Sequence, residues 1–328
     1  MDKSLKNSLH SSSRRADLRI RSRFISKAVL VTAFFFLTPA QGAPKATPAP
    51  KPTGLETYQD LILKAQNLTL QRDRLQASQI LLRGIQRETR GSQAHKELVK
   101  ALGELSSVFY SEKAQSAFSV GEAAAEARPR EAIEHFQEAL RLEDGNVSIL
   151  KAIARAHLAL AECEKADTQV KAAEAIDPHS PEVKLLSLQT LACSRNYESI
   201  LARLSIDETA SQDETDALVK SLRQGLHVQA LLRAPKPKND LKKAKSVMTT
   251  WEASAPDYPE VHFWKWEISK LSGAPDRMAA VKYSQACQNL TPRKRKSYSL
   301  DVNLCKGKEA VDSYLKDSGL NQSPDEKS

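Results

Sequence analysis

The hydrophobic positions along this chain follow the period of an α-helix. From Tyr58 onward, apolar residues recur every three to four positions, and this spacing predicts helices. The pattern itself returns after 34 residues, from residues 132–144 to residues 166–178. The aligned pairs of small or apolar positions are Ala132 with Ala166, Phe136 with Val170, Ala139 with Ala173, and Asp144 with Pro178. A fixed period of this length is typical of stacked helical hairpins, so we expect an all-α fold.

Each repeat also keeps one order of residue types. A small residue, a bulky one and a second small one are spaced by three and two residues, as in EAIEHFQEAL and KADTQVKAAEAIDP, where proline follows. Over residues 113–180 the chain therefore resembles the tetratricopeptide-repeat family. The resemblance implies a right-handed α-solenoid of helical hairpins that binds other proteins. In the family frame, four first-helix positions serve packing: Leu150, Ile153, Ala154 and His157.

The repeat pattern continues in weaker form on both sides. A first hairpin is expected at residues 58–91, and one long inserted helix at residues 93–113 separates it from the clear repeats. The predicted organisation, in chain order, is a signal peptide (1–42), a Pro/Ala/Lys-rich tether (43–54), an N-terminal tetratricopeptide-like array (55–206), an irregular helix and linker (207–239), C-terminal helical repeats with a cap (240–318) and a disordered tail (319–328).

The first 42 residues have the layout of a secretory signal. A basic stretch precedes the apolar run Ala28–Leu37, and small residues then predict cleavage before Ala43. The run is shorter than the roughly 20 residues that span a bilayer, so the mature form is expected to have no transmembrane helix. Retention as an anchor stays open. We expect an exported protein, periplasmic or extracellular. The signal and tether favour a bacterial origin, although the sequon at Asn67 leaves a eukaryotic secreted protein open.

Export changes the charge balance. The whole chain carries +9, but residues 1–42 hold eight Lys or Arg against two Asp, a net +6, which leaves about +3 for the rest. A near-neutral mature chain does not predict a nucleic-acid partner.

All four cysteines lie in the exported part, at Cys163, Cys193, Cys287 and Cys305. An even number in an oxidising compartment suggests disulfides. The family frame places Cys163 at the start of a second helix and Cys193 at the end of the next first helix, on one edge, which favours their pairing. For Cys287 and Cys305 two alternatives stay open. They are the remaining pair, but each is expected late in one of two antiparallel helices, beyond the reach of a disulfide.

The sequence lacks the patterns that carry chemistry. It has no HExxH, no GxSxG and no Gly-rich phosphate loop, and its histidines and cysteines never take metal-ligand spacing. We therefore predict a non-catalytic protein without cofactor or metal.

The first helices of such an array line a concave surface. The family frame places Phe118, Ser148, Lys151, Arg155 and Gln189 on it. Lys151 and Arg155 are four residues apart and point the same way, so they are candidates to hold a carboxylate of a partner peptide. The resemblance to the carboxylate-clamp type is partial, because the required asparagines are missing. An exposed basic face is the alternative.

A second candidate surface lies in HFWKWE. Trp266 fits a packing position, whereas Phe263 and Trp264 lean toward the groove, where exposed aromatic residues anchor partners. Burial of all three is the alternative. The basic run Arg293 to Lys296 is expected between helices, as a solvated loop or a contact to an anionic envelope polymer.

Together these features predict a scaffold for a protein or peptide partner in a bacterial envelope complex for motility, wall synthesis or secretion. The alternative is an envelope-polymer binding protein, which would recognise a glycan or an anionic lipid through HFWKWE and the basic run.

Overall fold

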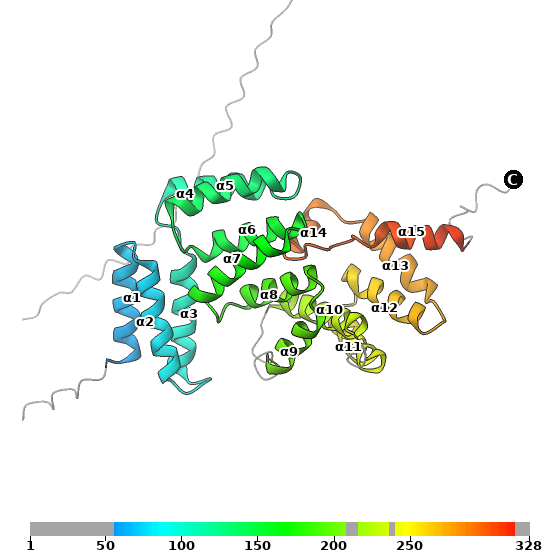
Figure 1. Ribbon diagram of the computed structural model, residues 1–328, viewed down its shortest axis with the longest axis horizontal. Coiled ribbons are helices and arrows are strands. Elements are labelled where there is room, and N and C mark those ends of the chain that lie inside the picture. Colours follow the sequence, from blue (N-terminus) through cyan, green and yellow to red (C-terminus); the bar gives the residue numbers. More distant parts are fainter. Residues whose placement is uncertain (1–55, 208–215, 236–239, 319–328) are drawn as a thin grey trace, which may run out of the picture. The chain divides into compact units, whose positions relative to one another are not determined.

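The computed structural model describes residues 56–207, 216–235 and 240–318, and these form fifteen helices and no strand (Figure 1). The all-α fold expected from the sequence is confirmed for these residues. The predicted signal peptide, tether and tail lie outside them. No helix among the described residues is long and apolar enough to cross a membrane.

The helices follow one another through short connections. They are α1 (Tyr58–Leu70), α2 (Arg74–Arg87), α3 (Gln93–Ser107), α4 (Glu112–Ala124), α5 (Pro129–Leu142), α6 (Val147–Ala159), α7 (Cys163–Ile176), α8 (Pro181–Cys193), α9 (Tyr197–Asp207), α10 (Ala217–Arg233), α11 (Leu241–Ser254), α12 (Pro259–Leu271), α13 (Arg277–Gln288), α14 (Pro292–Ser297) and α15 (Lys308–Asp317).

Local sequence determines where many helices begin. Thr57 caps α1 through a reciprocal pair of hydrogen bonds with Asp60, and Asn146 accepts from the first N–H groups of α6. Proline, which has no N–H to satisfy, occupies the first position of α5, α8, α12 and α14.

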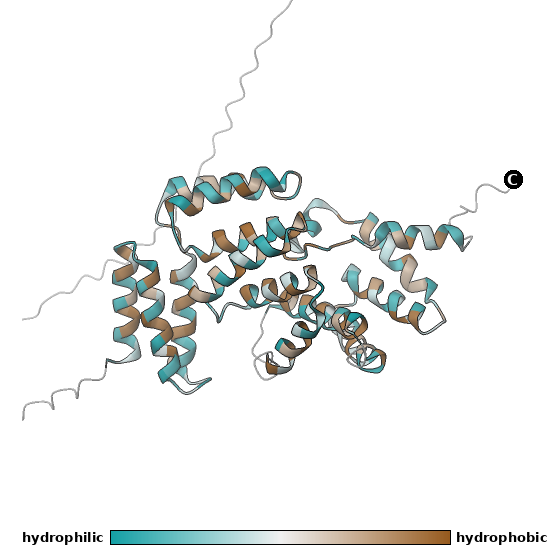
Figure 2. Ribbon diagram, viewed as in Figure 1, coloured by the Kyte–Doolittle hydropathy of each residue, from teal (hydrophilic) through white to brown (hydrophobic). Residues whose placement is uncertain are grey.

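The repeating small residues bring paired helices together. Successive helices pack in pairs, α4 with α5 and α6 with α7. The predicted positions Ala132 and Ala166 are fully buried, and the bulky positions Phe136 and Val170 are each 1% exposed. Figure 2 shows hydrophobic and hydrophilic residues alternating around the helices, as expected when one side of each packs on a neighbour.

The inserted helix is shorter than predicted. α3 ends at Ser107, and residues 108–111 form an extended turn before α4, so the expectation of one helix through residue 113 is wrong. Ser111 caps α4, which explains the break. α3 packs against α1 and α2 and also contacts α6.

The end of the chain also differs from expectation. The basic run, predicted as a loop, forms the short helix α14, and residues 298–307 then continue without an α-helix until α15. We call residues 298–307 the clasp. Cys305 lies in the clasp and not late in a helix, so its predicted position is wrong.

Candidate functional site

The predicted groove residue of α4 is part of an aromatic stack. The half-buried ring of Phe118 lies 5.2 Å from that of Phe109 and 5.4 Å from that of Phe136, measured between centroids. A β-carbon added at Gly121, one turn further on, would lie 2.5 Å from the Phe136 ring. This end of the predicted groove therefore serves packing between α4 and α5.

The predicted groove residues of α6 face the next hairpin. Ser148 is half-buried, and its backbone N–H donates to Asn146 Oδ1 at 2.9 Å. Lys151 Nζ lies 2.6 Å from Glu182 Oε2 of α8, and Arg155 Nη1 lies 4.0 Å from the same oxygen. Lys151 and Arg155 do point the same way.

Neither of these cations forms an exposed basic face. The side chains of Lys151 and Arg155 are 13% and 24% exposed, so that alternative is wrong. The carboxylate that they hold comes from the chain itself. It belongs to Glu182 of α8, the first helix of the next hairpin, which packs beside α6. A partner carboxylate would have to compete with Glu182.

The predicted groove residue of α8 is covered. Gln189 is 4% exposed, and its Nε2 donates to the carbonyl oxygen of Leu300 in the clasp at 2.9 Å. Gln189 Oε1 is buried without a hydrogen-bond partner. The clasp therefore covers a surface that the repeat pattern predicted to be an exposed groove.

Three polar contacts hold the clasp against α12 and α13. The Tyr258 hydroxyl donates to Asp301, the backbone N–H of Cys305 donates to Glu260 Oε1 at 2.7 Å, and the N–H of Gly307 donates to the Tyr283 hydroxyl at 3.1 Å. No sequence motif marks these partners, because they lie 24 to 45 residues apart.

A cavity of about 460 Å³ remains between the clasp and α6, α8, α10 and α12. Phe263 and Trp264, the predicted aromatic anchors, both line it. Both rings are half-buried, and Trp266 is 3% exposed, so the alternative of complete burial holds only for Trp266.

Two carboxyl groups line this cavity. Burial and, to a smaller extent, the nearby Asp301 carboxylate raise the pKa of Glu260 to about 8. The pKa of Asp301 is also raised, chiefly by burial. The pKa of Tyr258 is raised by burial and by Asp301, so its hydroxyl keeps the proton that it donates.

The cysteines form two disulfides, Cys163–Cys193 and Cys287–Cys305. The first bond joins the start of α7 to the end of α8, with Cα atoms 5.6 Å apart, as the repeat frame favours. The second joins α13 to the clasp, with Cα atoms 5.7 Å apart. The geometric objection to the second pair fails, because Cys305 does not lie in an antiparallel helix.

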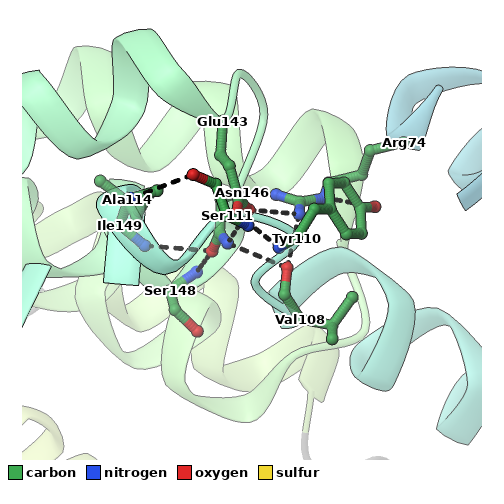
Figure 3. A network of polar contacts seen from close by, with 9 residues as sticks. All are labelled: Arg74, Val108, Tyr110, Ser111, Ala114, Glu143, Asn146, Ser148 and Ile149. Atoms are coloured by element: carbon green, nitrogen blue, oxygen red, sulfur yellow. Dashed lines mark hydrogen bonds and ion pairs between the residues drawn. The ribbon is translucent and has the colours of Figure 1, made fainter. Parts of the chain in front are cut away.

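A buried polar network joins α2 to the turns before α4 and α6 (Figure 3). Glu143 binds Arg74 and the backbone N–H of Ser111, and Arg74 also donates to the carbonyl oxygen of Val108. No repeat position or motif in the sequence marks this network. A charged residue at a repeat turn was the only available signal.

Among the described residues, no group of three or more His, Cys, Asp or Glu side chains is arranged to hold a metal ion. His157, a predicted packing position, is 6% exposed, and its Nδ1 lies 2.7 Å from Glu162 Oε2.

The family model described as tetratricopeptide repeat matches residues 123–190, which run from the end of α4 into α8. A comparison with curated proteins found no match. The matched segment contains the α6–α7 hairpin and the buried small residues of both clear repeats. Residues 123–190 therefore form a tetratricopeptide-repeat segment of the chain.

Proposed function

We propose that this protein is an exported, non-catalytic scaffold that holds a protein partner in a bacterial envelope complex serving motility, wall synthesis or secretion. The tetratricopeptide match at residues 123–190 carries the proposal, because arrays of this family generally bind proteins. The two disulfides support an oxidising compartment, and the basic and apolar residues before Ala43 support export.

The contact surface that we propose for the partner centres on α6. Lys151 and Arg155 share one carboxylate, and the Glu182 side chain is still 34% exposed, so a partner carboxylate can reach the same cations. Reversing Lys151 alone would place two carboxylates together and confuse loss of binding with loss of folding.

A charge swap avoids this difficulty. Lys151→Glu combined with Glu182→Lys keeps an ion pair between α6 and α8 but inverts its direction. Proteins that are cross-linked to the exported chain in the envelope fraction should be lost from the swapped variant. The matched control, Lys171→Glu with Asp167→Lys, swaps an exposed pair on α7 and should retain them. Unchanged capture by both variants would reject α6 as the contact surface.

Export is tested separately. The N-terminus of the protein recovered outside the cytoplasm should begin at Ala43, and its four cysteines should resist alkylation until they are reduced. Free thiols in the freshly isolated protein would argue against an oxidising compartment.

The second candidate is binding of an envelope polymer. All six residues of α14 are exposed, including Arg293, Lys294 and Lys296. Sedimentation with wall polymer or anionic vesicles that is abolished by Lys294→Glu with Lys296→Glu, but survives the α6 charge swap, would favour this function. Protein capture that survives the α14 substitutions but is lost in the α6 charge swap would favour the scaffold.

A further inference from the structure

The cavity under the clasp contains a buried carboxyl group, Glu260, and none of the groups that act on its pKa is a cation. Glu260 is 8% exposed, and the Cys305 N–H and the Tyr283 hydroxyl both donate to its Oε1. Both of these hydrogen bonds therefore engage the same oxygen of the carboxyl group. The groups that act on its pKa are Asp301, Cys305 and Tyr283.

A buried acceptor in the same cavity is unsatisfied. Gln189 lines the cavity, is 4% exposed, and has no hydrogen-bond partner at Oε1. A buried acceptor without a donor costs free energy of about 1–3 kcal/mol. Its presence in the cavity that Glu260 also lines indicates that the cavity accepts a donor from outside the chain.

The walls of the cavity are aromatic. Trp264 and Phe263 line it with rings that are half-buried and 5.2 Å apart, and Tyr258 and Trp251 line it from below the clasp. Aromatic faces attract cations, most strongly where water is excluded.

The chain's own cations do not fill the site. Arg233 lines the cavity, but its side chain is 51% exposed and lies 3.7 Å from Glu267. Lys306 is exposed, and its positive charge acts on Asp301, where it partly opposes the rise in the pKa of that carboxyl group. These two side chains lie where the cavity meets solvent, and Glu260 lies in its buried part.

We propose that this cavity binds an organic cation, an ammonium or guanidinium group on a short alkyl chain. Glu260 is its counter-ion, Gln189 Oε1 accepts one of its N–H groups, and Trp264 and Phe263 enclose the alkyl stem. The volume of about 460 Å³ lies within the range of small-ligand sites. The same chemistry is offered by a free amine and by a lysine or arginine side chain of a partner.

The site goes beyond the scaffold function and does not depend on it. Lys151 and Glu182 do not line this cavity, so the α6 charge swap leaves it unchanged. Failure of either test is therefore distinguishable from failure of the other.

The test is calorimetric titration of the purified protein with butylammonium and butylguanidinium, and with butanol as the neutral probe. The cations should bind and butanol should not. Because a cation requires ionised Glu260, affinity should rise by about tenfold between pH 6 and pH 7, with protons released on binding. The titratable and charged groups that line the cavity or contact Glu260 are Asp301, Tyr258, Tyr283, Lys306 and Arg233. Asp301 is the second carboxyl group of the cavity, and Asp301→Asn separates its contribution to the pH dependence.

The variants identify the residues. Glu260→Gln should weaken cation binding at least tenfold and abolish the pH dependence, whereas Glu309→Gln, an exposed carboxylate of α15, should change neither. Trp264→Leu, which leaves the carboxylate in place, should weaken binding if Glu260→Gln does not fold. Equal binding of butanol, or affinity that is unchanged in both Glu260→Gln and Trp264→Leu, overturns the proposal.

A further arm distinguishes the source of the cation. Capped lysine and arginine derivatives carry the same groups beside a peptide backbone. Binding at least as tight as that of the free amines assigns the site to a partner side chain. Binding of the free amines alone assigns it to a small molecule. Either result supports a cation site, and binding of neither class overturns it.

Discussion

Arg74 and Glu143 form a buried ion pair across 69 residues of sequence, with Nη2 and Oε2 3.0 Å apart. Their side chains are 1% and 2% exposed. Glu143 also accepts from the N–H groups of Tyr110 and Ser111, and Arg74 donates to the Val108 carbonyl. The pair therefore fastens α2 to the turn between α3 and α4, where periodicity alone predicted a continuous helix.

Removing one partner should be strongly destabilising. Glu143→Gln leaves the Arg74 guanidinium buried without a counter-charge, so we expect a loss of about 3–5 kcal/mol in the free energy of unfolding. Glu138→Gln removes half of an exposed pair on α5 and should cost at most about 1 kcal/mol. Urea denaturation of the two variants measures the difference. Equal losses would show that the buried pair is not important for stability.

Repeat periodicity predicted the core but not the connections between its parts. The small residues Ala132 and Ala166 had to be buried, because any larger residue every 34 positions would separate paired helices. The same pattern placed Cys163 beside Cys193, because both lie at helix ends in adjacent hairpins. Local spacing was sufficient for these features.

Contacts between distant segments were not accessible in this way. Gln189 was assigned to an open groove because its place in α8 is a groove position, but Leu300 covers it from 111 residues away. Lys151 and Arg155 point the same way, yet their pairing with Glu182 of the neighbouring first helix was not predicted. Periodicity shows which face a residue occupies and carries no information about what covers that face.

Close packing of α4 on α5 depends on a missing side chain. A β-carbon at Gly121 would lie 2.5 Å from Phe136, so Gly121→Ala should displace that buried ring and cost about 1–3 kcal/mol. At Gly103, in α3, the nearest atom would be Asp177 Oδ2 at 3.8 Å. Gly103→Ala should therefore be stabilising by about 0.5–1 kcal/mol through helix propensity. Thermal unfolding of both variants should show shifts of opposite sign, and a loss at Gly103 would contradict this packing argument.

The two disulfides should contribute similar amounts to the free energy of unfolding, but their loss should affect different parts of the structure. They close loops of 30 and 18 residues, so replacing either pair by serine should cost about 3 kcal/mol. Only loss of Cys287–Cys305 releases the clasp from α13. Hydrogen exchange at the Cys305 and Gly307 amides, which donate to Glu260 and Tyr283, should accelerate in that variant. In the Cys163/Cys193 variant it should not. Equal acceleration in both variants would mean that the disulfide does not hold the clasp.

The raised pKa of Glu260 predicts lower stability in mildly alkaline solution. An unfolded glutamate ionises near its ordinary pKa of 4.5, whereas the folded carboxyl retains its proton up to about 8. Between these values the folded state binds more protons, so the free energy of unfolding falls as pH rises through that window and levels off above it. Asp301, whose pKa is also raised by burial, acts in the same direction.

Urea denaturation at about pH 5 and about pH 8 measures this effect. Glu260→Gln should flatten the decline, while Glu309→Gln should leave it intact. Asp60, Glu162 and Asp312 have lowered pKa values. Their contribution to the free energy of unfolding is lost only as pH falls below their ordinary pKa values, which lies outside this window. Addition of butylammonium should restore part of the stability at about pH 8, because a bound cation favours the ionised carboxylate in the folded state alone. A Glu260→Gln protein with an unchanged pH profile would assign the decline to other groups.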